Sequence, residues 1–381
     1  MRYRELGKTG LKISEIGFGA EWMERHSKEE AAEVLAFCQE QGINILDCWM
    51  SDPQVRDHLG FALKNRRKEW IIQGHLGSTW QDNQYTRTRD MDKTKEAFED
   101  LLERLGTNYI DIGMIHYVDE PEEYHQIMDG EYYKYAQELK EKGVIGHIGM
   151  STHNPDVALM AANSGEIEVI MFSINPAFDM LPPTNDIEEY FKEQYDKDLG
   201  GIDPVRAELY RSCERNEIGL TVMKGYAGGR LFKKETSPFG VALTPVQCIH
   251  YALTRPGVTS IMAGFDTVDH VKDAVFYEKA AEEEKDFASV IANAPFHSYS
   301  GQCTYCGHCQ PCPSEINIAV VNKYADLAAM QDSTPASVKE HYLSLNAHAS
   351  DCIQCGNCEE RCPFGVEIIE KMKETASLFG R

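Results

Sequence analysis

Short apolar runs alternate with longer amphipathic stretches along the first two thirds of the chain. Each run has the length and composition of a buried strand. Between the runs, stretches such as "KEEAAEVLAFCQEQG" and "DKTKEAFEDLLERLG" space their apolar residues by three and four and end in glycine, which predicts helices. The predicted strands are Ile13 to Phe18, Asn44 to Cys48, Trp70 to Gly74, Tyr109 to His116, Gly146 to Ser151, Val169 to Ile174, Leu220 to Lys224 and Ser260 to Gly264.

Eight strand and helix units over roughly 270 residues match an α/β fold of the (β/α)8 barrel type in number, order and length. A doubly wound open sheet is the alternative, but no GxGxxG sequence follows the first strand. The opening "YRELGKTGLKI" predicts a hairpin that turns at Lys8 to Gly10 and covers the barrel floor.

The cysteines are unevenly distributed. Only four of the twelve precede residue 300, and the other eight lie in two groups between residues 303 and 362. A disulfide framework suits small secreted domains, but the N-terminus lacks the apolar stretch of a signal peptide. Thiols at two-residue spacings therefore indicate a metal site.

The second group, "CIQCGNCEERCPFG", has the C-x2-C-x2-C-x3-C-P spacing of bacterial ferredoxins, whose fourth thiolate binds the other cubane. The first group, "CTYCGHCQPCP", is one residue short before its last cysteine. Crossed ligation assigns one [4Fe-4S] cluster to Cys303, Cys306, Cys309 and Cys362, and the other to Cys312, Cys352, Cys355 and Cys358.

Two tetrahedral zinc sites are the alternative, because four cysteines also suit zinc. Zinc motifs usually separate two cysteine pairs by a longer loop, whereas successive two-residue gaps fit the corners of a cube. We predict two [4Fe-4S] clusters, one-electron chemistry and an anaerobic host. The expected domains are a barrel at 1–295 and a small α-helical, ferredoxin-like di-cluster domain at 296–381.

The charge balance disfavours some classes of binding partner. With 61 acidic and 38 basic residues the formal charge is -23, which disfavours nucleic acid and anionic lipid as partners. No apolar run approaches the length of a membrane span. We expect a cytoplasmic protein that binds a small molecule and a redox partner such as a ferredoxin.

Ionisable residues follow several predicted strands, where barrel enzymes carry out their chemistry. Packing alone remains the alternative for any one of them, most of all for His153 and Lys224. The residues at these strand ends are Asp47, Asp52, His75, His116, His153 and Lys224.

The segments "YRELGKTGLKISEIGFG", "INILDCW", "YIDIGMIH", "IGHIGMSTH", "VMKGYAGGRL" and "SIMAGF" together resemble the aldo/keto reductase family, and the tail resembles its subgroup with a two-cluster ferredoxin domain. The resemblance covers the whole chain. It implies a (β/α)8 fold and an oxidoreductase that usually transfers hydride from a nicotinamide to a carbonyl.

The family's catalytic tetrad is Asp, Tyr, Lys and His, in which tyrosine donates the proton. By position, the resemblance assigns the aspartate to Asp47 and the histidine to His116. The tyrosine position holds Asp52 and the lysine position holds His75. An aspartate has an unperturbed pKa of about 4 and cannot donate at pH 7. We therefore hypothesise that His75, paired with Asp47, is the proton donor and that His116 orients the substrate oxygen.

The resemblance also implies a nicotinamide site, which is altered here. Ser151 occupies a carboxamide position, and Gly228, Gly229 and Gly264 lie where backbone faces the phosphates. Asp266 stands where NADPH-dependent relatives carry an arginine, so NAD(H) is a candidate and NADP(H) is disfavoured. Methionines replace the amide-holding glutamine and the stacking aromatic, at Met171 and Met223.

Three functions remain open. The first couples the two clusters to reduction, or reverse oxidation, of a small carbonyl substrate in the barrel. The second is an NAD(H)-dependent carbonyl reductase or alcohol dehydrogenase whose clusters dock a partner. The third is a non-catalytic electron carrier. The segment Pro182 to Pro204 is expected to cover the substrate or to decorate the surface.

Overall fold

A closed barrel of eight parallel strands forms the centre of the computed structural model. The structure describes residues 1–180, 202–294, 301, 303, 305, 307–328, 334 and 336–381. Neighbouring strands follow one another in the chain, as the alternation of apolar runs predicts. The barrel strands are β3 (Ile16–Gly19), β4 (Ile45–Cys48), β5 (Ile71–Leu76), β8 (Ile110–Ile115), β9 (Ile145–Thr152), β10 (Val169–Ser173), β11 (Gly219–Met223) and β12 (Val258–Gly264).

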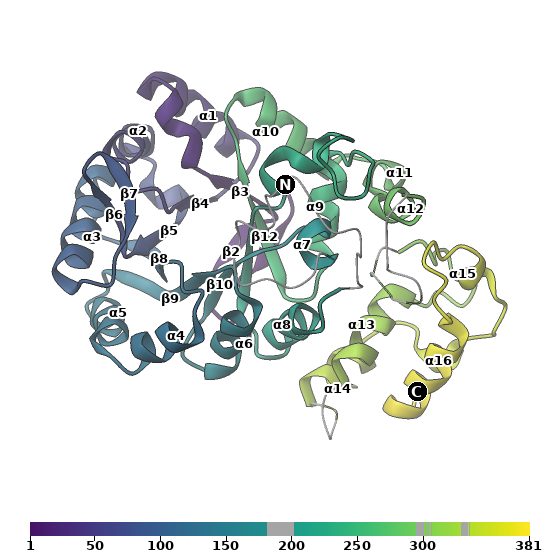
Figure 1. Ribbon diagram of the computed structural model, residues 1–381. Coiled ribbons are helices and arrows are strands. Elements are labelled where there is room, and N and C mark those ends of the chain that lie inside the picture. Colours follow the sequence, from purple (N-terminus) through teal and green to yellow (C-terminus); the bar gives the residue numbers. More distant parts are fainter. Residues whose placement is uncertain are drawn as a thin grey trace.

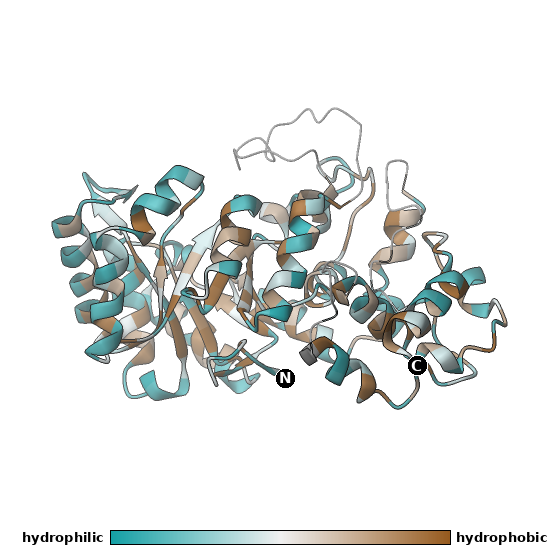
Figure 2. Cartoon of the chain, turned by 90° about the horizontal axis from the view of Figure 1, so that it is seen from below, coloured by the Kyte–Doolittle hydropathy of each residue, from teal (hydrophilic) through white to brown (hydrophobic). Residues whose placement is uncertain are grey.

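Helices surround the strands as an outer layer (Figure 1). Figure 2 shows hydrophobic residues along the strands and hydrophilic residues on the outward faces of the helices. The helices that follow β3, β4, β5 and β8 are α1 (Lys28–Glu40), α2 (Pro53–Leu63), α3 (Met91–Leu105), α4 (Pro121–Met128) and α5 (Glu131–Glu141). Those that follow β9 to β12 are α6 (Pro155–Ser164), α7 (Pro176–Met180), α8 (Pro204–Arg215), α9 (Pro245–Leu253), α10 (Val268–Val275), α11 (Glu282–Lys285) and α12 (Phe287–Ala292).

Side chains at the helix starts explain where two of these helices begin. Ser27 accepts a hydrogen bond from the backbone of Glu30, whose carboxylate in turn accepts from the backbone of Ser27. Thr244 and Gln247 form the same capping box before α9. These reciprocal bonds satisfy amide groups that a helix leaves unpaired in its first turn.

The N-terminal hairpin forms as expected from β1 (Tyr3–Glu5) and β2 (Lys12–Ser14). Fully buried Leu6 and Ile13 pack with interior barrel residues such as Ile112, so the hairpin closes the barrel floor. The predicted single strand from Ile13 to Phe18 is wrong in one respect. The chain divides there into β2 and β3, which pair with different partners, and the Ser14 hydroxyl donates to the carbonyl of Ile16 across the junction.

A second hairpin, which the sequence analysis did not predict, follows β5. Its strands are β6 (Ser78–Gln81) and β7 (Gln84–Arg87), and they pair in antiparallel register around a two-residue turn. Asp82 and Asn83 both have positive φ in that turn, which is the geometry that such residues tolerate best. The hairpin stands beside the carboxyl end of the barrel and carries Tyr85.

The C-terminal region is helical and lies against the outer layer of the barrel (Figure 1). Lys323 forms an ion pair of 2.6 Å with Glu214, and His308 approaches Asp286 to 2.8 Å. The guanidinium of Arg255 lies 5.6 Å from the ring centre of Tyr305. The helices of this region are α13 (Ile318–Ala328), α14 (Ala336–Leu343), α15 (Asn357–Glu360) and α16 (Ile368–Phe379).

Among the described residues, no helix has the length and hydrophobicity that crossing a membrane requires. The segment from Pro182 to Pro204 is the one expected to cover the substrate or to decorate the surface. Its residues 182–201 lie outside the described part of the chain.

Candidate active site

A cavity of about 770 Å³ opens at the carboxyl ends of the barrel strands. This is the end of a (β/α)8 barrel at which substrates bind. Its lining combines acidic, imidazole and aromatic side chains with glycine backbone. Of the described residues, those that line it all precede or include Asp273, so the C-terminal region contributes none of them.

Asp47 and His75 lie on the neighbouring strands β4 and β5 and are both buried, at 1% and 2% exposure. Nε2 of His75 lies 2.9 Å from Oδ1 of Asp47. The same oxygen accepts a bond of 3.0 Å from the amide of Gln73. The carboxylate thus fixes the orientation of the imidazole and favours a proton on its Nε2.

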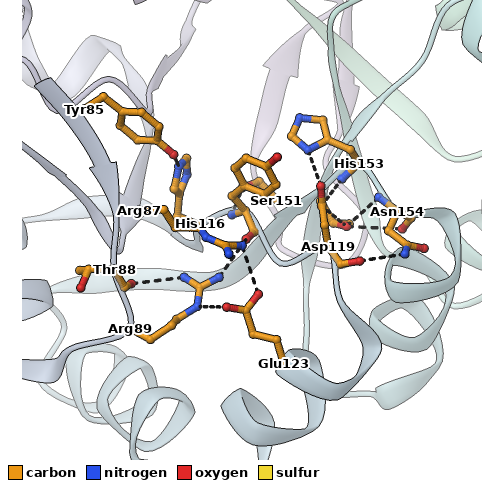
Figure 3. A network of polar contacts seen from close by, with 12 residues as sticks. Tyr85, Arg87, Thr88, Arg89, His116, Asp119, Glu123, Ser151, His153 and Asn154 are labelled. Carbon is orange, nitrogen blue, oxygen red and sulfur yellow. Dashed lines mark hydrogen bonds and ion pairs between the residues drawn. The ribbon is translucent and has the colours of Figure 1, made fainter. Parts of the chain in front are cut away.

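His116 follows β8 and links His75 to the cavity surface. Its Nδ1 lies 2.8 Å from Nδ1 of His75. Its Nε2 lies 2.7 Å from the hydroxyl of Tyr85, as Figure 3 shows for His116 and Tyr85. Burial, together with the nearby charge of His75, lowers the pKa of His116 well below its usual value. His116 therefore tends to stay neutral, with one nitrogen available to accept and the other to donate.

Tyr85 is a site residue that sequence reasoning missed. Its ring meets the indole of Trp49 edge to face at 5.2 Å, and Trp49 stacks in parallel with His116 at 6.1 Å. Burial raises the pKa of Tyr85 to about 12, so the phenol keeps its proton at neutral pH. The alternating sequence "STWQDNQYTR" around Asp82 and Asn83 is a hairpin signal that could have located it.

Two predicted positions differ in the structure. His75 belongs to β5 itself rather than to the loop after it, since the strand continues to Leu76. Asp52 does not line the cavity. Its carboxylate instead accepts a 2.7 Å bond from the backbone of Gln54 and caps α2, which is the ordinary role of an aspartate before a proline-led helix.

Ser151 and His153, at and after the end of β9, both line the cavity. The hydroxyl of Ser151 accepts a 2.8 Å bond from the backbone of Tyr117. Asp119 lies 3.0 Å from Nδ1 of His153 (Figure 3). Although burial acts to raise the pKa of Asp119, its bonds from His153 and Thr152 lower it overall. His153 is therefore a tethered wall residue of the cavity.

Three glycines, Gly228, Gly229 and Gly264, line another side of the cavity. Gly228 and Gly229 have positive φ and line the opening, and a side chain at Gly229 would meet little but Phe232. Gly264 is crowded, because an added Cβ would lie 2.8 Å from the indole nitrogen of Trp22. Asp266 forms a 2.6 Å contact with His26.

Met171, Met223 and Lys224 also line the cavity. Glu21 is a further wall residue that the sequence analysis did not name. Burial raises the pKa of its carboxyl, although a 3.2 Å bond from Trp49 opposes the effect. A carboxyl of this kind adds a further proton-binding group to the site.

The cysteine groups line two smaller cavities in the C-terminal region. One contains Cys303, Cys309 and Cys362, and Cys306 lies outside the described residues. The other brings Cys312, from the first motif, together with three cysteines of the second motif, Cys352, Cys355 and Cys358. Apolar side chains, including Ile316, Val366 and Met372, complete the walls.

The thiols also receive backbone and amide hydrogen bonds. Cys352 accepts from the backbone of Gln354 at 3.4 Å, and Cys303 from the amide of Asn322 at 3.5 Å. Such bonds favour thiolates and tune iron-sulfur clusters. In the part of the chain that the structure describes, no three His, Cys, Asp or Glu side chains are grouped as a single metal ion would need. The donor chemistry and the paired cavities suit clusters.

Comparison with protein families identifies two matching regions. Residues 15–292 match the model of the aldo/keto reductase family, and residues 299–366 match that of a 4Fe-4S dicluster domain. An uncharacterized oxidoreductase, YqkF of Bacillus subtilis, is 27% identical over 290 residues, which cover 72% of this chain and 90% of that protein. The NADH-specific methylglyoxal reductase of Escherichia coli is 26% identical over 180 residues, covering 43% and 54% of the two chains.

Solved structures support the same fold. The holo form of the aldo-keto reductase AKR11C1 from Bacillus halodurans superposes with a TM-score of 0.59 at 24% identity, covering 78% of this chain and 98% of that one. The putative aldo-keto reductase PA4992 from Pseudomonas gives a TM-score of 0.55 at 22% identity, covering 72% and 93%. At this level of identity the likeness concerns the barrel architecture.

Proposed function

Because the chain belongs to the aldo/keto reductase family and carries a 4Fe-4S dicluster domain, we propose that it couples two [4Fe-4S] clusters to the reduction of a small carbonyl compound in the barrel mouth. The reverse oxidation of the alcohol uses the same groups. The observation that carries this proposal is the continuous hydrogen-bonded series from Asp47 through His75 and His116 to the cavity.

Asp47 and the two imidazoles lie where they can handle one of the two protons that carbonyl reduction by cluster electrons consumes, the proton that is added to the carbonyl oxygen. The carboxylate of Asp47 bonds to Nε2 of His75, and His116, whose pKa is lowered by burial, provides a neutral acceptor beside Nδ1 of His75. The geometry revises the hypothesis of direct donation from His75, because both of its ring nitrogens are engaged by protein groups. His75 acts as a proton reservoir whose proton leaves through His116.

The clusters supply electrons one at a time when bound. We propose crossed ligation, in which each cluster receives three thiolates from one motif and the last cysteine of the other. The two cysteine-lined cavities support this proposal, since Cys312 and Cys362 each line the cavity of the opposite motif. We propose that the two domains meet between residues 295 and 296. Both of these residues lie outside the described part of the chain.

A second candidate is an NAD(H)-dependent carbonyl reductase whose clusters exchange electrons with a redox partner such as a ferredoxin. It is favoured by the position of the C-terminal region on the outer helices, from which no described residue reaches the cavity. The open space at Gly229 and the cavity volume of about 770 Å³ leave room for a dinucleotide. A non-catalytic carrier is disfavoured by the buried Asp47 and His75 pair.

Anaerobic titration of the cluster-loaded protein distinguishes these functions. Bleaching of the clusters by dithionite or a reduced ferredoxin, followed by reoxidation on addition of an aldehyde or dicarbonyl, supports the cluster-coupled reductase. Saturable bleaching by NADH supports the second candidate. Clusters that are reduced but never reoxidised by any carbonyl contradict both enzymes and leave the electron carrier.

A further inference from the structure

The polar series in the barrel mouth has one accessible end. Asp47, His75 and His116 are 1%, 2% and 5% exposed, whereas Tyr85 is only partly buried and lines the cavity. Each imidazole uses both ring nitrogens within the series, so neither has a nitrogen left for a substrate. The Tyr85 hydroxyl has no hydrogen-bond partner other than His116 among the described residues.

The hairpin places this hydroxyl with little freedom. Ser78 at the start of β6 donates to the backbone of Trp49, and Ser51 donates to the backbone of Thr79, so the hairpin is bonded to the loop after β4. Trp49 then supports the Tyr85 ring edge to face. A phenol held in this way is positioned by the fold, as a proton-transfer group must be.

We propose, on the basis of the proposed function, that Tyr85 is the catalytic proton donor of this enzyme and that His116 and His75 return a proton to it. The tetrad tyrosine position, Asp52, is a helix cap, and a tyrosine from a different element supplies the phenol. A phenol whose proton is retained at neutral pH is suited to protonate a strongly basic oxyanion.

The proton transfers balance along the series. Two electrons supplied singly by the clusters and one proton taken from a water molecule, which leaves as hydroxide, are added to the carbonyl carbon, and an alkoxide remains. The O–H bond of Tyr85 breaks and a new O–H bond forms on that oxygen. The phenolate takes the Nε2 proton of His116, and Nδ1 of His116 takes the Nδ1 proton of His75. His75 keeps its Nε2 proton, which is hydrogen-bonded to Asp47, and solvent later returns one proton to its Nδ1.

The test compares Tyr85→Phe with Tyr133→Phe, which removes a hydroxyl bonded to Glu166 on the outer layer. Both variants keep their rings, and cluster content and melting temperature verify folding. Carbonyl reduction is measured under anaerobic conditions with dithionite or NADH as donor. We expect kcat of Tyr85→Phe to fall by at least about 100-fold with little change in KM, and Tyr133→Phe to match the parent protein.

A second readout is independent of turnover. In protein labelled with ¹⁵N-histidine, Tyr85→Phe should shift the ring nitrogen resonances of His116 and His75, and Tyr133→Phe should leave them unchanged. A Tyr85→Phe enzyme with kcat within about threefold of the parent overturns the assignment. If the parent protein reduces no carbonyl, the proposed function fails. Unchanged His116 and His75 ring resonances in Tyr85→Phe would overturn the relay, whether or not the parent protein reduces a carbonyl.

Discussion

His75 and His116 face each other through their Nδ1 atoms, which lie 2.8 Å apart. At this distance one nitrogen must carry the proton and the other must accept it. The carboxylate of Asp47 bonds to Nε2 of His75, which leaves Nδ1 of His75 to face His116. The arrangement stores one proton within reach of the cavity.

Replacing His75, which holds a proton beside the cavity, should slow turnover. We expect His75→Gln to lower kcat for carbonyl reduction by at least about 100-fold, because glutamine can bond to Asp47 but cannot transfer a proton. His147→Gln is the matched control, since His147 pairs with Glu168 away from the cavity. Steady-state kinetics give kcat for both variants. Equal losses of kcat in His75→Gln and His147→Gln would refute a specific role for His75.

Crossed ligation predicts which cysteine pairs share a cluster. Cys312→Ser with Cys352→Ser removes two ligands of one cluster, so about four iron atoms per chain should remain. Cys303→Ser with Cys312→Ser removes a ligand from each cluster, so both should be lost. Anaerobic iron and labile-sulfide assays measure the difference.

Cys38→Ala is the control for the cluster assay, because Cys38 is buried in α1 and should leave the iron content at about eight per chain. The reverse pattern, in which the first double variant loses both clusters and the second loses one, would show uncrossed ligation. Zinc without sulfide in the parent protein would restore the zinc alternative.

Asp266 should set the preference between nicotinamide cofactors if one binds. Its carboxylate repels a 2'-phosphate, so we expect NADH to bind at least about tenfold more tightly than NADPH, a difference of about 1.4 kcal/mol. Asp266→Ser should narrow the gap, and Asp269→Ser, on the exposed surface of α10, should not. Anaerobic fluorescence titration checks both. Tighter binding of NADPH by the parent protein would contradict this reading.

His250 makes stability depend on pH. Burial lowers the pKa of His250 to about 4 from its ordinary 6.5. Between these values the unfolded state binds the proton more tightly, so stability is full above pH 6.5 and declines as the pH falls toward 4. We expect the parent protein to lose about 2 kcal/mol between pH 7 and pH 5 through this group.

His250→Gln should remove that contribution, whereas His125→Gln, at an exposed position of α4, should retain it. Urea unfolding at the two pH values, followed by tryptophan fluorescence, gives the comparison. An equal loss in His250→Gln and in the parent protein would assign the pH dependence to other groups.

The barrel was predictable from the sequence because its strands are buried on both sides and therefore appear as short apolar runs. The position of Asp47 and His116 at the cavity was predictable because both stand at the ends of such runs. Tyr85 was not, because it lies on a half-exposed hairpin outside the barrel pattern and reaches His116 only through tertiary structure. Asp52 was predicted to be a site residue from its position along the chain. That position does not determine whether the side chain enters the cavity, and in the structure it caps α2 instead.

The most direct test of the central claim is product formation in a single turnover of nicotinamide-free protein whose clusters have been reduced with dithionite and freed of excess reductant. Cluster-coupled reduction predicts one alcohol for every two electrons lost from the clusters after an aldehyde is added. No alcohol, or alcohol only after NADH is supplied, would contradict it.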